Sequence, residues 1–457
     1  MHKTAAIHNL GCKVNSYEAD AMRQMLMEEG YEIVDFSVQA DVYVINTCSV
    51  TNVADKKSRQ MIRRARKTNP SAIVVACGCY VQTADRKALS DLDIDLVIGN
   101  NQKAELIPQL NRISAMRQNA PGPTDGREEE TPGQDALTGS VIDINQGVPA
   151  YEDLTISRQT GHTRAFIKVQ DGCNQFCTYC VIPLARGRER SLDADRVIDI
   201  ARTLTEKGHS ELVLTGIHTG RYYHDGTDFT ALVRRLLTEV PELRRLRISS
   251  IEMTEVTDEF IELMKNDERI ARHLHIPLQS GCDRTLKAMG RPYTTEDYLN
   301  KIESIRHEIP DISISSDVIV GFPGESEEDF AATVEFIERA RLSFLHVFPY
   351  AAKQHTVAAG MKQQVREEIK RQRVTKLTEL SDRLYNDYVS GLTGKQGKVL
   401  FERKMDGYWQ GHNSEYVLVK VASDEDLAGR ILTVSYHRRD GECLIGSLRE
   451  DQKHEHK

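Results

Sequence analysis

The sequence has no apolar run that approaches the ~20 residues a membrane-spanning helix needs, which excludes a chain anchored by its own helices. Its N-terminus, "MHKTAAIHNLGCKVN", lacks a charged segment followed by a long apolar stretch, so we do not expect secretion. The 457 residues are 40% apolar and 28% charged, which is typical of a soluble protein with two or three domains. We therefore expect a cytoplasmic protein with no membrane partner.

The sequence also lacks an even number of cysteines. Its nine cysteines argue against a simple framework of paired disulfides. In a reducing cytosol thiols stay free, so clustered cysteines favour metal binding or catalysis. The net charge of −8 excludes a bulk polycation, although it leaves room for local basic surfaces that bind RNA.

Residues 1–113 alternate apolar runs with helix-like segments. The apolar runs that we predict to be buried strands are residues 4–10, 41–47, 72–78 and 95–99. This alternation predicts a parallel α/β domain. The stretch from 114 to 140 is rich in Pro, Gly and acidic residues with little apolar content, which predicts a mobile linker or insertion. We place that linker at residues 114–158.

A second series of strands and helices covers residues 159–388. Its six strand-like segments begin at residues 163, 211, 244, 271, 313 and 343. Six βα units are fewer than the eight of a closed TIM barrel, so we predict a partial (β/α)6 barrel. Short strands with Gly turns in residues 389–452 predict a small β-barrel. The fold class is therefore α/β with a terminal all-β unit.

Three cysteines lie close together in "DGCNQFCTYC", directly after a predicted strand: Cys173, Cys177 and Cys180. Parallel α/β folds bind ligands at the carboxyl ends of their strands. No fourth thiol follows nearby, and an iron–sulfur cluster with three thiolates keeps one iron open to a small molecule. The alternatives are a zinc site closed by a distant histidine, or three structural thiols.

The CxxxCxxC spacing, with Tyr179 before the last cysteine, resembles the signature of radical S-adenosylmethionine (SAM) enzymes. The resemblance implies a [4Fe-4S] cluster whose open iron binds the amino and carboxylate groups of SAM. It further implies that an electron from the reduced cluster cleaves SAM to a 5′-deoxyadenosyl radical. The six βα units look like the partial barrel of that superfamily, which positions and shields the cofactor.

A second set of cysteines follows the first three predicted strands. Cys12 ends the first strand, Cys48 the second, and Cys77 and Cys79 the third. Thiols at the carboxyl ends of parallel strands fall on one edge of the sheet and can converge. Buried inert cysteines are common, so this placement alone leaves a structural role open.

The sequence around these cysteines resembles the N-terminal domain of the methylthiotransferases. The segments that carry the resemblance are "GCKVNSYEAD", "NTCSVTNVADKKSR" and "GCYVQ". The resemblance implies a second [4Fe-4S] cluster, held by Cys12, Cys48 and Cys79. Cys77 lies outside the matched positions and is the competitor for Cys79. The terminal barrel resembles the RNA-binding TRAM domain. One departure is "LTGIHTG", which has His218 where relatives often carry an amide.

Residues that hold SAM are expected at or beside strand ends. The candidates are Tyr179, Thr215, Gly216, Ser250, Glu252 and Gln279. Packing or barrel hydrogen bonding is an equal alternative for each.

RNA contacts are expected at two places. The segment "KKSRQMIRRARK" (56–67) carries seven basic residues, and Tyr408 and Trp409 look exposed in the terminal barrel. Together they can contact phosphates and stack on loop bases. A solvated helix face is the alternative for the basic segment.

The branch of the family is indicated by "GCKVN", which resembles the branch that adds a methylthio group to C2 of N6-threonylcarbamoyladenosine at tRNA position 37. The alternatives are the branches acting on N6-isopentenyladenosine in tRNA or on a ribosomal-protein aspartate. The alternatives that are not enzymes are a two-cluster electron carrier and an RNA-binding protein.

The implied partners are the tRNA anticodon loop, a reductant such as flavodoxin or ferredoxin, and a sulfur donor. No general base is needed at an aromatic C–H, so we expect no catalytic residue beyond the cluster ligands.

Overall fold

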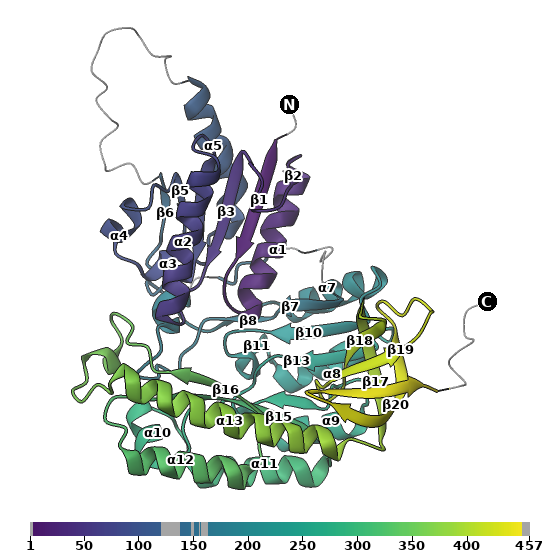
Figure 1. Cartoon of the computed structure of the whole chain (residues 1–457). Coiled ribbons are helices and arrows are strands. Elements are labelled where there is room, and N and C mark those ends of the chain that lie inside the picture. Colours follow the sequence, from purple (N-terminus) through teal and green to yellow (C-terminus); the bar gives the residue numbers. More distant parts are fainter. Residues whose placement is uncertain (1–2, 120–137, 148–149, 155, 157–162, 450–457) are drawn as a thin grey trace.

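The computed structural model describes residues 3–119, 138–147, 150–154, 156 and 163–449. The N-terminal sheet lies above the strands of the central part, and the terminal barrel packs at one end of those strands (Figure 1). None of the helices within the described ranges combines the length and the apolar character needed to cross a membrane.

The N-terminal sheet has six parallel strands in the order β2-β1-β3-β4-β5-β6. They are β1 (Thr4–Asn9), β2 (Glu32–Ile33), β3 (Val42–Thr47), β4 (Ile73–Gly78), β5 (Leu96–Ile98) and β6 (Thr138–Ser140). Every residue of β3 and β4 is buried, as expected for parallel strands covered on both faces. The four strands predicted in this part are confirmed.

Helices cover both faces of this sheet. They are α1 (Lys13–Glu28), α2 (Asn52–Thr68), α3 (Cys79–Thr83), α4 (Arg86–Ser90) and α5 (Leu106–Asn119), with the 3-10 turn η1 (Lys103–Glu105). Met22 of α1 and Leu110 of α5 share one core, whereas Ile62 of α2 lies in the core on the other face. The strand order changes direction between β1 and β3. The loops after these strands therefore border the crevice in which open α/β sheets bind ligands.

The segment predicted as a linker is helical and extended at its described ends. Residues 114–119 continue α5, because the apolar stripe of Leu106, Leu110 and Ile113 keeps this helix packed on the sheet. Thr138–Ser140 form β6 at the edge of the sheet. Helix α5 therefore continues into the segment predicted as a linker, and residues 120–137 lie outside the described residues. The remaining domain boundaries stay predictions.

The central part has six parallel strands in two sheets, β13-β10-β7 and β14-β15-β16. They are β7 (Arg164–Lys168), β10 (Glu211–Thr215), β13 (Arg245–Ile248), β14 (His273–His275), β15 (Ser313–Val320) and β16 (Phe344–Pro349). A bridge between Leu246 and Ile270 joins the two sheets. The predicted six-stranded partial barrel is confirmed.

Amphipathic helices cover the outside of these strands. They are α7 (Ala194–Glu206), α8 (Phe229–Glu239), α9 (Asp258–Asn266), α10 (Asp283–Met289), α11 (Thr295–Glu308), α12 (Glu327–Ala340) and α13 (Glu367–Gly391). Side chains cap the starts of several of them: Asp193 accepts from the backbone of α7, and Ser326 with Asp329 forms a capping box on α12. Figure 1 shows α13 running past β16 to the terminal barrel.

Shorter elements lie at the carboxyl ends of the central strands. They are β8 (Gln170–Asp171), α6 (Ile182–Arg186), β9 (Arg190–Ser191), η2 (Thr219–Arg221), β11 (Tyr223–His224), β12 (Thr227–Asp228), η3 (Met253–Glu255) and η4 (Val357–Gly360). β8 and β9 pair as an antiparallel hairpin whose connection contains the three cysteines of residues 173–180.

The terminal barrel is closed, with strand order β17-β18-β19-β21-β20. Its strands are β17 (Gln396–Met405), β18 (Tyr408–Asn413), β19 (Leu418–Ala422), β20 (Ile431–Asp440) and β21 (Cys443–Leu448). The predicted small barrel is confirmed, but the prediction that Trp409 is exposed is wrong. Trp409 is 8% exposed and donates its Nε1–H to the carbonyl of Glu425 over 2.8 Å, whereas Tyr408 is 37% exposed. Neighbouring positions on a strand face opposite sides, so only one of the pair reaches solvent.

A buried ion cluster attaches the terminal barrel to the central strands. Arg245 and Arg247 lie 3.1 and 2.7 Å from the carboxylate of Glu211. Arg245 also donates to the carbonyl of Lys398 over 2.7 Å, and Arg247 to that of Asn413 over 3.1 Å. Burial alone would raise the pKa of Glu211, but Arg247 and Arg245 outweigh it and lower the pKa to about 2.

Acid should therefore weaken this attachment. The unfolded pKa of a glutamate is about 4.3, so the stability from Glu211 is complete above that pH and is lost as pH falls through about 2. We expect Glu211→Gln to unfold more easily than wild type at pH 7, with the difference shrinking by about 3 kcal/mol between pH 5 and 2. Trp409 is the one tryptophan and lies in the terminal barrel, so its fluorescence during urea unfolding is the measurement. A difference that is constant with pH would contradict this.

Candidate active site

Three predicted ligands, Cys12, Cys48 and Cys79, lie at the edge of the N-terminal sheet where β1, β3 and β4 end. Gly11 has a φ of +108°, and a Cβ there would lie 2.9 Å from the Sγ atom of Cys48. Only glycine lets this turn approach Cys48 so closely. Burial raises the pKa of Cys48 to about 11, and the nearby thiols of Cys79 and Cys12 add to the rise. These three cysteines are called the N-terminal cage below.

Cys77 packs into the core of the domain and not at the edge of its sheet. It is fully buried, and its Sγ atom lies 3.8 Å from Sδ of Met22. Cys79 instead begins α3, and its Sγ atom lies 3.6 Å from Nδ2 of Asn100. This geometry favours Cys79 over Cys77 as the ligand, although the assignment stays a prediction.

The other predicted ligands, Cys173, Cys177 and Cys180, form the loop cage between β8 and α6. Gly172 has a φ of +73°, and any Cβ there would collide with a carbonyl across the hairpin. The backbone N–H of Cys180 donates to the carbonyl of Cys177 over 3.0 Å, which bends the loop. Burial raises the pKa of Cys180 to about 12, and Cys177 and Cys173 are close enough to raise it further. The loop therefore gathers its three thiols.

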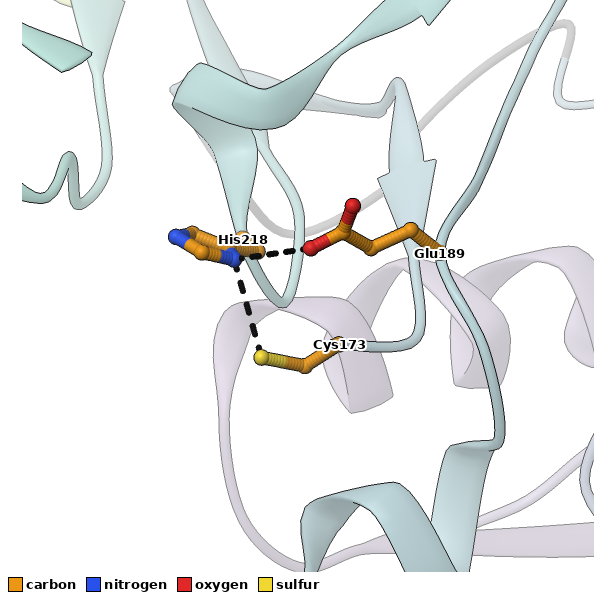
Figure 2. A group of neighbouring side chains, drawn as sticks. All are labelled: Cys173, Glu189 and His218. Atoms are coloured by element: carbon orange, nitrogen blue, oxygen red, sulfur yellow. Dashed lines mark hydrogen bonds and ion pairs between the residues drawn. The ribbon is translucent and has the colours of Figure 1, made fainter. Parts of the chain in front are cut away.

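Nitrogen donors surround the sulfur atoms of the loop cage. The backbone N–H of Gln175 donates to Sγ of Cys173 over 3.4 Å, and Arg291 donates to Sγ of Cys177 over 3.5 Å. Nδ1 of His218 lies 3.6 Å from Sγ of Cys173 (Figure 2). Donors of this kind stabilise thiolate over thiol. The surroundings of Cys173 and Cys177 therefore suit negatively charged sulfur.

A cavity of about 210 Å³ lies between the N-terminal sheet and the carboxyl ends of the central strands. Val50 and Thr51, which follow β3, form one wall, and Cys180 of the loop cage lies in another. Apolar side chains such as Ile182 and Phe348 complete much of the lining. The cavity therefore has residues next to both cages in its walls and apolar surfaces that exclude water.

A buried set of six charged side chains lies between the two cages. This charge hub consists of Glu18, Lys103, Lys168, Asp171, Arg186 and Arg190. The carboxylate of Glu18 lies 3.1 Å from Nζ of Lys103 and 2.9 Å from Nζ of Lys168. It also accepts from Arg186 over 2.8 Å. Because Glu18 comes from α1 and Arg186 from α6, the hub joins the N-terminal and central parts.

The charge hub reaches both cages through short contacts. Asn15 accepts from Arg186 over 2.6 Å, and its Oδ1 lies 3.9 Å from Sγ of Cys12. Asp171, two residues before Cys173, lies 3.2 Å from Arg186. The two cages are therefore held in one arrangement by the same guanidinium.

The charges of the hub fit anionic clusters in the cages. Burial alone would raise the pKa of Glu18, but Arg186, Lys103 and Lys168 hold it well below its usual range. The hub has four cations and two carboxylates, and Glu152 lies close enough to help raise the pKa of Lys168. The remaining buried positive charge favours a compensating anion in the cages. Nε of Arg186 is also buried without a hydrogen-bond partner among the described residues. Three thiolates in each cage are the donors that iron–sulfur clusters use, so the residues present fit such groups.

Two family models match this chain. Residues 167–337 match the Radical SAM superfamily, and residues 4–99 match the Uncharacterized protein family UPF0004. The first match includes the whole loop cage, and the second includes the whole N-terminal cage.

Relatives match over nearly the whole chain. The threonylcarbamoyladenosine tRNA methylthiotransferase MtaB of Bacillus subtilis (strain 168) is 41% identical over 438 residues, which are 94% of this chain and 93% of the relative. The chain belongs to the radical SAM methylthiotransferase family. MtaB of Aquifex aeolicus is 37% identical over 91% of this chain and 99% of the relative. The tRNA-2-methylthio-N(6)-dimethylallyladenosine synthase of Acetivibrio thermocellus is 32% identical over 98% of this chain and 91% of the relative.

A solved structure shares the fold of this methylthiotransferase. The radical SAM methyltransferase TsrM of Kitasatospora setae has a TM-score of 0.57 and 17% identity, covering 76% of this chain and 73% of that chain. Membership of the radical SAM superfamily implies a [4Fe-4S] cluster and SAM, and the methylthiotransferase family implies a second cluster.

Two of the six residues predicted to hold SAM, Tyr179 and Gln279, line the cavity of the methylthiotransferase. Gln279 has a φ of +70°, a left-handed conformation that costs on the order of 1–3 kcal/mol in a residue with a side chain. Its backbone is fixed there by β15, since it donates to Asp317 over 2.8 Å and accepts from Ile319 over 2.9 Å. Strain kept at a cavity wall supports a binding role for Gln279.

The other four predicted contacts are not in the cavity lining. Thr215 and Gly216 lie at the end of β10, and Ser250 follows β13. Glu252 pairs with Arg291, the residue that donates to the loop cage. All six residues stay predictions as SAM contacts.

Sequence patterns did not identify the buried charges of this methylthiotransferase. Arg186 interacts electrostatically with a thiol of the N-terminal cage, and Arg291 donates a hydrogen bond to a thiol of the loop cage. Neither arginine belongs to a cysteine motif. Arg186 follows Cys180 by six residues in "CVIPLARGR", so proximity to the cysteine loop was the available signal.

Proposed function

We propose that this protein transfers a methylthio group to C2 of N6-threonylcarbamoyladenosine at position 37 of tRNA. The observation that carries the proposal is the 41% identity to a threonylcarbamoyladenosine tRNA methylthiotransferase over 94% of the chain. The identity to a dimethylallyladenosine synthase is lower, at 32%. Two cages of three thiols beside one cavity support the same function.

In this proposal each cage holds one [4Fe-4S] cluster. Cys173, Cys177 and Cys180 are the ligands in the loop, and Cys12, Cys48 and Cys79 are the ligands at the sheet edge. When bound, the clusters supply the electron that cleaves SAM and the iron site that carries sulfur. Reduction and the consumption of sulfur require a reductant, such as flavodoxin or ferredoxin, and a sulfur donor.

The side chains of the protein have three tasks in this reaction. Gln175, Arg291 and His218 donate to the thiolates of the loop cage and fix their orientation. The apolar wall of the cavity excludes water, which protects reactive species. The charge hub fixes the positions of the two cages relative to one another. This matters because misplacement of reacting groups by about 1 Å can cost on the order of 100-fold in rate.

The test is mass spectrometry of tRNA nucleosides from a deletion strain with and without the gene. We expect 2-methylthio-N6-threonylcarbamoyladenosine to disappear in the deletion and to return with the wild-type gene. Cys180→Ala should not restore it. Loss of the methylthio group from the isopentenyl nucleoside alone would assign the protein to the branch that acts on N6-isopentenyladenosine in tRNA. Unchanged tRNA with a changed ribosomal protein would assign the protein-modifying branch.

A basic surface on α2 is placed to bind tRNA in this proposal. Its exposed basic side chains are Lys56, Lys57, Arg63, Arg64 and Lys67. The other two cations have protein partners, since Arg66 pairs with Asp95 over 2.6 Å and Arg59 stacks on Tyr80. Thr51 caps this helix and lines the cavity, so α2 extends from the wall of the site.

Neutralising this surface should weaken the binding of tRNA in a salt-dependent way. We expect Lys56→Ala/Arg63→Ala/Lys67→Ala to reduce the slope of log affinity against log salt by about 2, because each phosphate contact contributes about 0.7–0.9. Filter binding of tRNA at several salt concentrations measures the slope. Arg112→Ala, exposed on α5 across the sheet, should leave it unchanged. Equal slopes in the triple variant and wild type would contradict this role.

A further inference from the structure

His218 is the side chain that joins the loop cage to the ends of two central strands. It lies just before η2, after β10, and is 8% exposed. Figure 2 shows Nδ1 of the ring facing both Cys173 and Glu189, at 3.6 Å from Sγ of Cys173 and 3.1 Å from Oε1 of Glu189. On the other side of the ring, Nε2 lies 2.7 Å from Oε1 of Glu255 in η3.

These contacts decide where the protons of the ring are. The partners of Nδ1 are a carboxylate and a cysteine sulfur, which accept hydrogen bonds when the sulfur is a thiolate. Nδ1 therefore carries a proton, which Oε1 of Glu189 and Sγ of Cys173 share as acceptors. Glu189 and Glu255 lie against the ring from two elements, so the Nδ1–H group stays next to Cys173.

We propose that His218 is a positioning residue that holds an N–H donor against the thiolate of Cys173 and so raises the reduction potential of the loop cluster. The inference rests on the proposed function, which places a cluster in the loop cage. Hydrogen bonds to the sulfur atoms are among the features that set the potential of iron–sulfur clusters. Reduction adds negative charge to the cluster and its sulfur ligands, so an N–H donor at the sulfur stabilises the reduced form more than the oxidised form.

The experiment is a redox titration followed by electron paramagnetic resonance. The full chain carries Cys12→Ala, Cys48→Ala and Cys79→Ala, so that only the loop cluster gives a signal. In this background we expect His218→Leu to lower the midpoint potential by at least about 59 mV, a tenfold change for a one-electron couple. His218→Asn keeps an N–H donor on a shorter side chain, and its midpoint should lie nearer to that of wild type than the midpoint of His218→Leu does.

His224→Leu is the matched control. His224 lies on β11 a few residues later, half-buried, with Nδ1 3.4 Å from Asp193. Its replacement should leave the potential unchanged, because no contact links it to the loop cage among the described residues. An equal shift in both histidine variants would overturn the assignment to His218.

Loss of the cluster is distinguished from a change in its potential by iron and sulfide analysis of each variant. His218→Phe keeps the ring volume without a donor and is the second variant if His218→Leu holds no iron. An unchanged midpoint in either variant overturns the proposal. Failure of both to hold iron also overturns it, because His218 would then serve cluster retention. Absence of the methylthio nucleoside in vivo contradicts the proposed function and leaves the midpoint result intact.

Discussion

Alanine in place of Cys12 is expected to abolish methylthio transfer to tRNA while SAM is still cleaved to 5′-deoxyadenosine. The two cages come from separate segments, so removing one thiol of the N-terminal cage leaves Cys173, Cys177 and Cys180 in place. Iron analysis after anaerobic reconstitution should fall from about eight to about four atoms per chain, the content of one [4Fe-4S] cluster. Product formation should become undetectable.

Cys77→Ala is the control for this experiment. Cys77 lies two residues before Cys79 but packs in the core with Met22. Its replacement should keep the full iron content and the methylthio product, with a loss of unfolding free energy of about 1 kcal/mol. Loss of iron in Cys77→Ala with full loading in Cys79→Ala would exchange their roles. Methylthio transfer by Cys12→Ala would contradict the two-cage account.

The gathering of thiols in the loop cage could be predicted because its sequence signal is local. The loop cage lies within eight residues of one loop, so its spacing alone brings the thiols together. The N-terminal cage needed one further step, since Cys12, Cys48 and Cys79 follow three strands of one parallel sheet. Parallel strands share a carboxyl edge, and this rule predicts that the thiols after these strands lie together. The rule does not separate Cys79 from Cys77, which only the resemblance to the methylthiotransferases did.

The charge hub could not be predicted because its members are far apart in the sequence. Glu18 and Arg186 are 168 residues apart, and nothing in the periodicity of either segment marks the pair. The same limit applies to Trp409, whose neighbour Tyr408 is the exposed one. Residue type cannot decide which of two adjacent aromatic residues on a strand faces the core; strand register decides it.

A further ion pair joins the N-terminal and central parts. Nζ of Lys353, in the segment after β16, lies 2.6 Å from the partly buried carboxylate of Asp55 in α2. Together with the charge hub, this contact attaches the N-terminal part to the central part. The geometry between the cages therefore depends on ion pairs that cross between the two parts.

Replacement of Glu18 should be strongly destabilising. Removing its carboxylate leaves Lys103, Lys168 and Arg186 buried without their shared partner. Breaking a buried ion pair by removing one partner typically costs about 3–5 kcal/mol. We expect Glu18→Gln to lose that much unfolding free energy in urea at pH 7, followed by circular dichroism.

The pH dependence and a matched variant make this expectation specific to the hub. The pKa of Glu18 is held well below its usual range, so its contribution is complete above about pH 4.3 and is lost as pH falls through the folded pKa. Glu28→Gln changes an exposed glutamate on the same helix and should stay within about 0.5 kcal/mol of wild type. Since Arg186 also contacts Asn15 beside Cys12, Glu18→Gln should lower iron loading of the N-terminal cage more than that of the loop cage. Unfolding of Glu18→Gln at the wild-type urea concentration would show that the hub contributes no net stability.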